Sequence, residues 1–252
     1  MSSRPTLVTI SFSHYCEKAR WALDRAGIAY REEAYVPVVH LLGTVRRGGR
    51  STPLLELGDG TPSLKDSTDI LAYVERAKPG LLYPEDPSER REVSELEELF
   101  DAELGPHARR LVYHLLLDSG SSMAPVIRET TQGAQRALAP VLAPIVGRMV
   151  KRGLKVDAEG AARSRPRVEA VCARVEALLA DGRGFLVGGR FTAADLTFAA
   201  LYSPLVGPPE HPVTSRVEEA PSYRAMCAEN RRRPAGQFAM AIYERERARV
   251  IA

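Results

Sequence analysis

The stretch LVTISFSHYCEKARWALDRAG, residues 7–27, carries the clearest fold signal in the chain. It opens with the β-rich run Leu7–Ile10, which is long enough for a buried strand. From Tyr15 to Ala26, alanine and leucine recur at a spacing of three and four residues, which predicts a helix with one apolar face. Gly27 follows where the end of a helix favours a left-handed residue. The stretch therefore predicts a strand that leads directly into a helix.

The segments that follow, up to residue 78, continue this alternation. We expect a strand over 28–35, a short irregular helix and a loop over 37–50, a hairpin of 54–57 and 63–65 around Gly58-Asp59-Gly60, and a helix over 67–75. This order predicts a small α/β domain over residues 1–78.

The second half of the chain has a different pattern. A Pro- and Gly-rich stretch predicts a linker over residues 79–90, and beyond it the apolar residues recur with the helical period. Residues 91–252 are therefore expected to be all-helical, with a bend at Gly105-Pro106 in the first helix. Further helices are expected at about 124–152, 165–180, 193–203, 222–231 and 235–249. Thr192 and Asp195 have the spacing of a capping box, in which each side chain satisfies a backbone amide at the start of a helix.

Composition excludes several classes of protein. Of the 252 residues, 44% are hydrophobic and 27% are charged, and the net charge is only +3, which indicates a globular chain rather than a disordered one. The most apolar stretch, Ala137–Val150, is shorter than the roughly 20 residues of a membrane span, and the first residues lack the apolar core of a secretory signal. Three distant cysteines indicate neither a disulfide framework nor a zinc site, which favours a reducing, cytoplasmic location.

The basic residues do not indicate a nucleic-acid partner. Only five of the 35 basic residues are lysines, a bias typical of a GC-rich bacterial genome. The arginine clusters at 46–50 and 231–233 are short and separate, whereas a nucleic-acid surface concentrates basic residues with aromatic residues between them. We therefore expect solvated surface at both clusters, and neither nucleic acid nor membrane as a partner.

Ser13 lies at the junction of the first predicted strand and its helix. The N-terminus of a helix favours an anion such as a thiolate, because its free amides and its dipole end are positive. A thiol with a pKa of about 8.5 is only about 3% ionised at pH 7, so a hydroxyl that donates to the sulfur would raise the share of the nucleophilic form. The alternative is that Ser13 only caps the helix.

Two further positions could bind a ligand. Pro53 directly precedes a predicted strand; if its peptide bond is cis, the backbone of Thr52 could pair with an extended ligand. Asp66 and Ser67 begin a predicted helix, and Ser67 suits its N-cap. The first amides of this helix could bind the carboxylate of a ligand, and Asp66 could bind an ammonium. For each position a purely structural role is the alternative.

In this order and spacing, the motifs resemble those of the cytosolic glutathione transferase superfamily. The helical half adds Phe185-Leu186-Val187-Gly188-Gly189 before the capping box, so the resemblance covers nearly the whole chain. It implies a thioredoxin-like domain followed by a helical bundle domain that forms the second-substrate site. It also implies glutathione as co-substrate, a hydrophobic electrophile, no metal and a homodimer.

The resemblance also implies roles for individual residues. Ser13 would stabilise the glutathione thiolate, and Pro53 would be the cis-proline whose neighbour Thr52 pairs with the cysteinyl amide. Asp66 and Ser67 would bind the γ-glutamyl end of glutathione, and Arg50 would bind its glycyl carboxylate. Tyr113 and His114 would contact the second substrate, and Thr192 and Asp195 would form the structural cap.

The sequence departs from the family pattern in three places. His14 follows the serine where many members have proline, Thr52 replaces the usual valine, and the helical half has extra residues around 118–160 and 204–250. Two alternatives to a transferase therefore remain. In one, Cys16 performs a glutathione-dependent thiol–disulfide exchange; in the other, the chain binds ligands or partners without catalysis.

Overall fold

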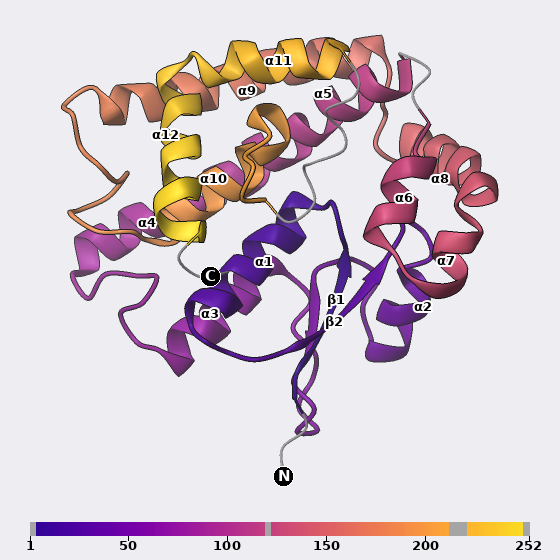
Figure 1. Ribbon diagram of the computed structural model, residues 1–252. Coiled ribbons are helices and arrows are strands. Elements are labelled where there is room, and N and C mark those ends of the chain that lie inside the picture. The colour runs from indigo at the N-terminus through magenta and orange to yellow at the C-terminus, as the bar shows by residue number, and fades with distance from the viewer. Residues whose placement is uncertain (1–3, 119–121, 212–220, 249–252) are drawn as a thin grey trace.

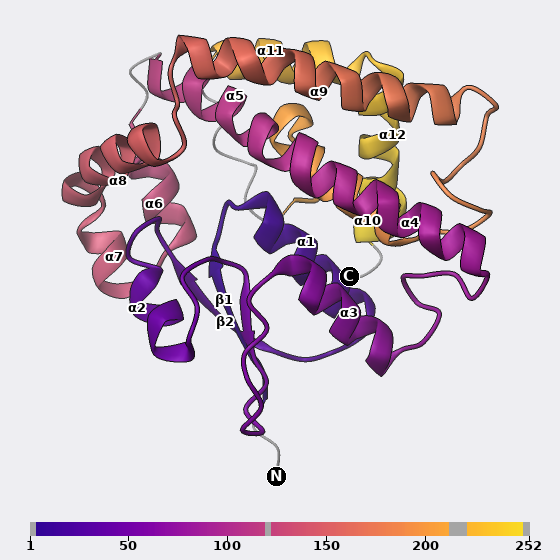
Figure 2. The same cartoon turned by 180° about the vertical axis from the view of Figure 1, so that it is seen from behind.

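The computed structural model describes residues 4–118, 122–211 and 221–248. The chain folds into a small sheet domain and a larger helical domain (Figures 1 and 2). Among the residues described, every helix falls short of the length and apolarity that a membrane span requires.

The first domain is built around a three-stranded sheet in the order β2-β1-β3. The parallel pair β1 and β2 runs in register from Thr6 opposite Arg31 to Ile10 opposite Tyr35, whereas β3 pairs antiparallel with β1. The second strand of the expected hairpin is reduced to a single bridge between Leu55 and Leu64. The elements are β1 (Thr6–Ile10), α1 (His14–Arg25), β2 (Arg31–Tyr35), α2 (Leu41–Thr44), a 3-10 turn (Val45–Arg47), β3 (Leu54–Glu56) and α3 (Ser67–Ala77).

The second domain is helical, as the apolar period predicts. Its elements are α4 (Pro87–Leu99), a π-helical turn (Phe100–Leu104), α5 (Gly105–Asp118), α6 (Ala124–Thr130), α7 (Gly133–Ala137), α8 (Ala139–Gly153), α9 (Ala158–Leu179), α10 (Ala193–Val206), α11 (Pro221–Arg231), α12 (Pro234–Ile242) and a second π-helical turn (Tyr243–Arg247).

Two expected boundaries differ from the structure. The first helix of the second domain, α4, begins at Pro87, inside the expected linker. Asp86 caps it, because its carboxylate accepts from the amides of Ser88 and Glu89, both at 2.9 Å. The single helix expected over 124–152 is three helices. The chain is extended at Thr131 and Gln132 and left-handed at Gly133, and it leaves the helical conformation again at Leu138. A continuous helical period in the sequence does not reveal such a break.

Helix α10 is the centre of the core and joins the two domains. Nearly all of its side chains are buried, and it packs against α1 of the first domain and against α4, α5 and α12 of the second. At its N-terminus the buried carboxylate of Asp195 accepts from the amide of Thr192 at 2.8 Å, from the Thr192 hydroxyl at 2.9 Å and from the amide of Leu186 at 2.7 Å. Burial raises the pKa of Asp195 to about 6, although these hydrogen bonds oppose the shift. The capping box expected at this position is therefore present.

Helices α6, α7 and α8 form a lobe at one edge of the molecule, next to α2 (Figures 1 and 2). The lobe has its own small core, in which Val36 of the first domain packs with side chains of α6 and α8. Gln135 of α7 fastens the lobe to the end of β2, since its side chain accepts from the Val36 amide at 3.0 Å and donates to the Ala34 carbonyl at 3.3 Å. The α6–α8 lobe, which lies within the first of the two segments expected to be extra, therefore packs against the sheet domain at the end of β2.

Candidate active site

Ser13 stands at the corner between β1 and α1. It is the N-cap of α1 by backbone conformation, and its amide donates to the carbonyl of Ile10 at 2.9 Å. Its hydroxyl makes no capping hydrogen bond, and the residue lines a largely apolar cavity. The corner therefore places Ser13 beside this cavity, at the positive end of a helix.

The two residues after Ser13 clamp this corner to the helical domain. The Nε2 of His14 lies 3.0 Å from the carbonyl oxygen of Gly105, and the hydroxyl of Tyr15 donates to the carbonyl of Asp101 at 2.7 Å. Pro106 explains why the second carbonyl needs a partner. In the π-helical turn each amide donates to the carbonyl five residues earlier, and the Gly105 amide donates to the Phe100 carbonyl. The Asp101 carbonyl would by the same pattern accept from residue 106, but Pro106 has no amide proton. At Gly105-Pro106, where the sequence predicted a bend, the structure has the end of a π-helical turn, and the missing Pro106 amide leaves the acceptor that Tyr15 satisfies.

His14 is neutral in this position. Burial lowers its pKa to about 3, and the nearby Arg109 guanidinium adds to the shift. A neutral ring can donate its Nε2 proton to the Gly105 carbonyl, so His14 joins the two domains by a hydrogen bond and carries no charge.

Cys16 lies in the core beneath the corner and lines neither of the two cavities described here. Burial raises the pKa of its thiol, although Arg20, the Ile10 amide and the hydroxyls of Ser13 and Thr52 oppose the shift. Reactive cysteines are accessible and have a lowered pKa, so Cys16 has the properties of a packing residue.

The Thr52-Pro53 peptide bond is cis, which confirms the expectation for this position. It precedes β3, the edge strand opposite β2 in the sheet. Ser51 and Thr52 each line both the apolar cavity and a second, polar cleft. Thr52 therefore stands where the two spaces meet.

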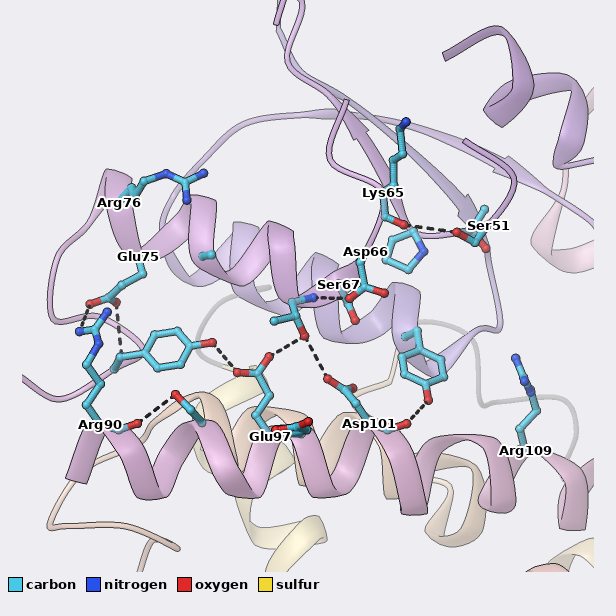
Figure 3. Close-up of a pocket in the computed structure, with 18 residues that line it drawn as sticks. Ser51, Lys65, Asp66, Ser67, Glu75, Arg76, Arg90, Glu97, Asp101 and Arg109 are labelled. Carbon is cyan, nitrogen blue, oxygen red and sulfur yellow. Dashed lines mark hydrogen bonds and ion pairs between the residues drawn. The ribbon is translucent and has the colours of Figure 1, made fainter. Parts of the chain in front are cut away.

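Asp66 and Ser67 lie in the polar cleft, which has a volume of about 840 Å³ (Figure 3). The N-cap of α3 is Asp66, whose carboxylate accepts from the amide of Thr68 at 2.9 Å; the suggestion that Ser67 caps this helix is wrong. Ser67 is instead the first helical residue, so its amide belongs to the unpaired donors of the helix N-terminus. The exposed Asp66 and Lys65 give the cleft one carboxylate and one ammonium beside these amides.

The wall of the polar cleft opposite α3 is formed by α4 and the π-helical turn. Glu97 and Asp101 extend from it toward α3 (Figure 3). Behind them lies Lys18, whose side chain is 0% exposed and donates to Glu97 at 2.9 Å and to Asp101 at 2.6 Å. The Thr68 hydroxyl lies 3.0 Å from both carboxylates. One ionic network around the buried Lys18 therefore joins α1, α3, α4 and the π-helical turn beneath the cleft.

The apolar cavity has a volume of about 450 Å³ and lies between the domains. Its walls include the loop before α2, the α5 residues Val112 and Leu116, and the end of α8. Of the two expected second-substrate contacts, Tyr113 lines this cavity and His114 does not. Arg50 also lines the apolar cavity, with its carbonyl 3.3 Å from the Nε2 of His40, while Lys65 is the basic residue in the polar cleft next to Asp66.

Arg109 is a site residue that sequence reasoning missed. It lines both spaces, and within the described ranges its guanidinium has neither a hydrogen bond nor an ion pair; the Nε atom is buried without a partner. In Figure 3 the side chain extends from α5 with no dashed line to any drawn residue. Only its position in a helix was visible in the sequence, since the space beside it is created by contacts between distant segments. No cluster of three or more metal-ligating side chains occurs among the residues that the structure describes.

Two family models match the chain. The glutathione S-transferase N-terminal domain matches residues 7–82, and the glutathione S-transferase C-terminal domain matches residues 158–225. Together they span more than half of the sequence and fall on the two structural domains. The chain belongs to the glutathione transferase superfamily.

Solved structures of glutathione transferases share this fold. A possible glutathione S-transferase from Rhodopseudomonas palustris is 19% identical to this chain. The match covers 97% of this chain and 95% of that protein, with a TM-score of 0.60. A theta class glutathione S-transferase from Xanthomonas axonopodis pv. citri with glutathione bound is 22% identical, with coverages of 94% and 97% and a TM-score of 0.53. The β-etherase LigF from Sphingobium is 19% identical, with coverages of 95% and 99% and a TM-score of 0.59. Among curated protein sequences, none matches significantly.

Proposed function

We propose that this protein is a glutathione transferase that activates the glutathione thiol at Ser13 for attack on a small apolar electrophile. One observation carries the proposal. Ser51, Thr52 and Arg109 line both the polar cleft that holds Asp66 and the apolar cavity that holds Ser13. A peptide that spans this junction would have its charged end in the cleft and its sulfur in the cavity.

In the proposed complex the γ-glutamyl end of glutathione binds at the start of α3. Its ammonium pairs with Asp66, and its carboxylate accepts from the amide of Ser67 at the start of the helix. The cysteinyl amide pairs with the backbone of Thr52 beside Pro53. Arg50 and His40, on the rim of the cavity, are then the candidates for the glycyl carboxylate.

The sulfur would lie near Ser13 at the N-terminus of α1. The hydroxyl donates to the thiolate, and the helix end adds a positive potential. Arg109 supplies a full positive charge at the same junction and has no carboxylate partner among the described residues. These three contributions favour the thiolate over the thiol, and so increase the share of the nucleophile at neutral pH.

The second substrate would occupy the apolar cavity against Val112, Tyr113 and Leu116. Burial of an apolar electrophile beside the activated sulfur supplies proximity, which accounts for much of the rate that such a site can provide. Exchange chemistry at Cys16 is not favoured, because its thiol is buried and has a raised pKa.

Turnover of an aromatic halide with glutathione tests this proposal. We expect Ser13→Ala to lower kcat by about 10²-fold or more, since the variant removes a donor to the reacting sulfur. Ser88→Ala, an exposed serine at the start of α4, is the matched control and should retain activity. Unchanged turnover in the Ser13 variant would reject the role of Ser13; no turnover and no thermal stabilisation by millimolar glutathione in the wild type would favour a non-catalytic member of the family.

We further propose a homodimer in the cytoplasm. Family membership supports the dimer, and the free, widely spaced cysteines are consistent with a reducing compartment. Sedimentation at micromolar concentration tests the assembly, because a single monomeric species would contradict it.

A further inference from the structure

Large apolar side chains are exposed in one region of the molecule. On the α8 segment Leu138, Val141, Ile145 and Met149 are 51%, 61%, 45% and 47% exposed. The other large apolar residues exposed in the described ranges are Leu41, Leu42 and Val45, on α2 and the turn after it. Scattered single residues of this kind are normal on a protein surface, whereas concentration on two segments marks an interaction surface. Both segments lie at the same edge of the molecule in Figures 1 and 2.

Helix α8 is apolar on two faces. Ala139, Ala143, Val146 and Val150 are buried in the small core of the α6–α8 lobe. The exposed residues also follow each other at intervals of three or four, so they form a second stripe on another side of the same helix. The described residues cover the first face and leave the second in contact with solvent.

The charged residues of the segment that carries the stripe are all positive. Residues 131–156 contain no Asp or Glu. The basic residues of this segment are exposed and form no ion pair with the part of the chain that the structure describes; they are Arg136, Arg148, Lys151, Arg152 and Lys155. Elsewhere on the surface, several arginines, such as Arg163, Arg167 and Arg183, do have a carboxylate partner.

We propose that the outer face of α8 binds the surface of a membrane that contains anionic phospholipid. An apolar stripe flanked by unpaired Lys and Arg is the pattern of a helix that lies in the interface plane, with its apolar side chains among the acyl chains and its basic groups at the lipid phosphates. The binding is peripheral, because the stripe follows one side of a helix within a folded lobe.

Charge and apolarity together select this partner over two others. A nucleic acid would pair with the basic residues but would leave four large apolar side chains uncovered. A second copy of this face would cover the stripe but would bring five unpaired positive charges against five more, which is destabilising in close contact. Composition predicted no membrane partner, because the most apolar stretch, Ala137–Val150, is too short to span a bilayer. Peripheral binding does not need that length.

The surface also continues into the apolar cavity. Met149 belongs to the exposed stripe and lines that cavity, together with Val150, Gly153 and Leu154 of the same segment. A bilayer docked on α8 would therefore lie next to a route for apolar molecules. The docking proposal itself does not depend on whether the cavity is catalytic.

Co-sedimentation of the full chain with lipid vesicles tests the proposal. The vesicles contain equal parts of phosphatidylglycerol and phosphatidylcholine, and vesicles of phosphatidylcholine alone are the comparison. One variant, V141S/I145S, removes exposed apolar side chains; a second, R148Q/K151Q/R152Q, removes charge. The matched control, R165Q/R174Q/R232Q, removes the same charge from exposed positions on α9 and beyond α11. All substituted side chains are exposed, so the variants should fold.

The wild type should bind the anionic vesicles and bind phosphatidylcholine weakly. Partition should fall by about five-fold for each charge removed from α8, hence by about a hundred-fold in the triple variant, and the control should bind like the wild type. The apolar variant should also bind less. The proposal is overturned if the wild type does not bind anionic vesicles, if V141S/I145S binds them unchanged, or if V141S/I145S instead abolishes self-association in sedimentation velocity. Tighter binding of the wild type to duplex DNA than to the vesicles would likewise overturn it.

Discussion

At the scale of single residues, the corner after β1 combines one cavity-lining side chain and two supporting side chains. Ser13 lines the apolar cavity, while His14 and Tyr15 hydrogen-bond to the carbonyls of Gly105 and Asp101. The sequence shows His14 only as a departure from the family's proline. In the structure this residue replaces the rigidity of a proline with a hydrogen bond to the other domain.

The buried His14 predicts a loss of stability in acid. Its pKa is about 3 when folded and about 6.5 when unfolded, so acid protonates the unfolded chain first. The contribution of His14 to the free energy of unfolding is fully present above pH 6.5. It falls as the pH is lowered toward 3, by about 2 kcal/mol between pH 7 and pH 5. His211, whose pKa burial lowers to about 4, adds a similar loss. Urea unfolding at the two pH values should show a smaller difference for His14→Gln than for the wild type, and an equal difference would contradict this assignment.

At the scale of elements, the π-helical turn determines how the two domains meet. It redirects the Asp101 and Gly105 carbonyls toward α1, and it requires a residue without a side chain at Gly105. A Cβ atom there would lie 2.2 Å from the Tyr15 hydroxyl oxygen and 2.5 Å from its Cζ. The close approach of α1 and α5 therefore depends on this glycine.

Gly105→Ala should displace the Tyr15 ring and break its hydrogen bond to Asp101. We expect the free energy of unfolding to fall by about 1–3 kcal/mol. Gly147→Ala, in α8, is the matched control; its new Cβ would make only an ordinary contact of 3.6 Å with Leu117, and the change should stabilise by about 0.5–1 kcal/mol. Tyr15→Phe should restore part of the loss in the Gly105 variant. Equal stability of the two glycine variants would contradict the requirement for glycine at position 105.

At the scale of the whole molecule, the polar cleft rests on the ionic network that joins the two domains. Lys18 of the first domain forms ion pairs with Glu97 and Asp101 of the second, and one hydrophobic cluster runs through both domains. The domains are therefore expected to unfold together, and the cleft to lose its shape when the network is broken.

Lys18→Met tests this coupling. It leaves two carboxylates facing each other without a cation, which should cost about 3–5 kcal/mol in the free energy of unfolding. Lys78→Met, at an exposed lysine after α3, is the control and should change stability by less than about 0.5 kcal/mol. Urea unfolding measures both. A loss below about 1 kcal/mol for the Lys18 variant would show that the network contributes little.

Local patterns predicted much of the architecture, and long-range contacts account for what they missed. Leu7–Ile10, the helix after it and the apolar period of the second half correspond to observed elements because each depends on neighbours in sequence. The resemblance to the family located Pro53 and its cis bond. In contrast, the cavity residue Arg109 and the clamp at Tyr15 depend on packing between distant segments. The two apolar faces of α8 were hidden because periodicity does not tell which face is covered.

The ionisation of glutathione bound to the protein tests the central claim most directly. Ultraviolet difference titration of the thiolate in the wild type should place the pKa of the bound thiol about two units below its value of about 8.5 in solution. In Ser13→Ala most of that difference should disappear while glutathione still binds. A bound thiol that titrates as it does in free solution, or a lowered pKa that survives the loss of the Ser13 hydroxyl, would contradict the account.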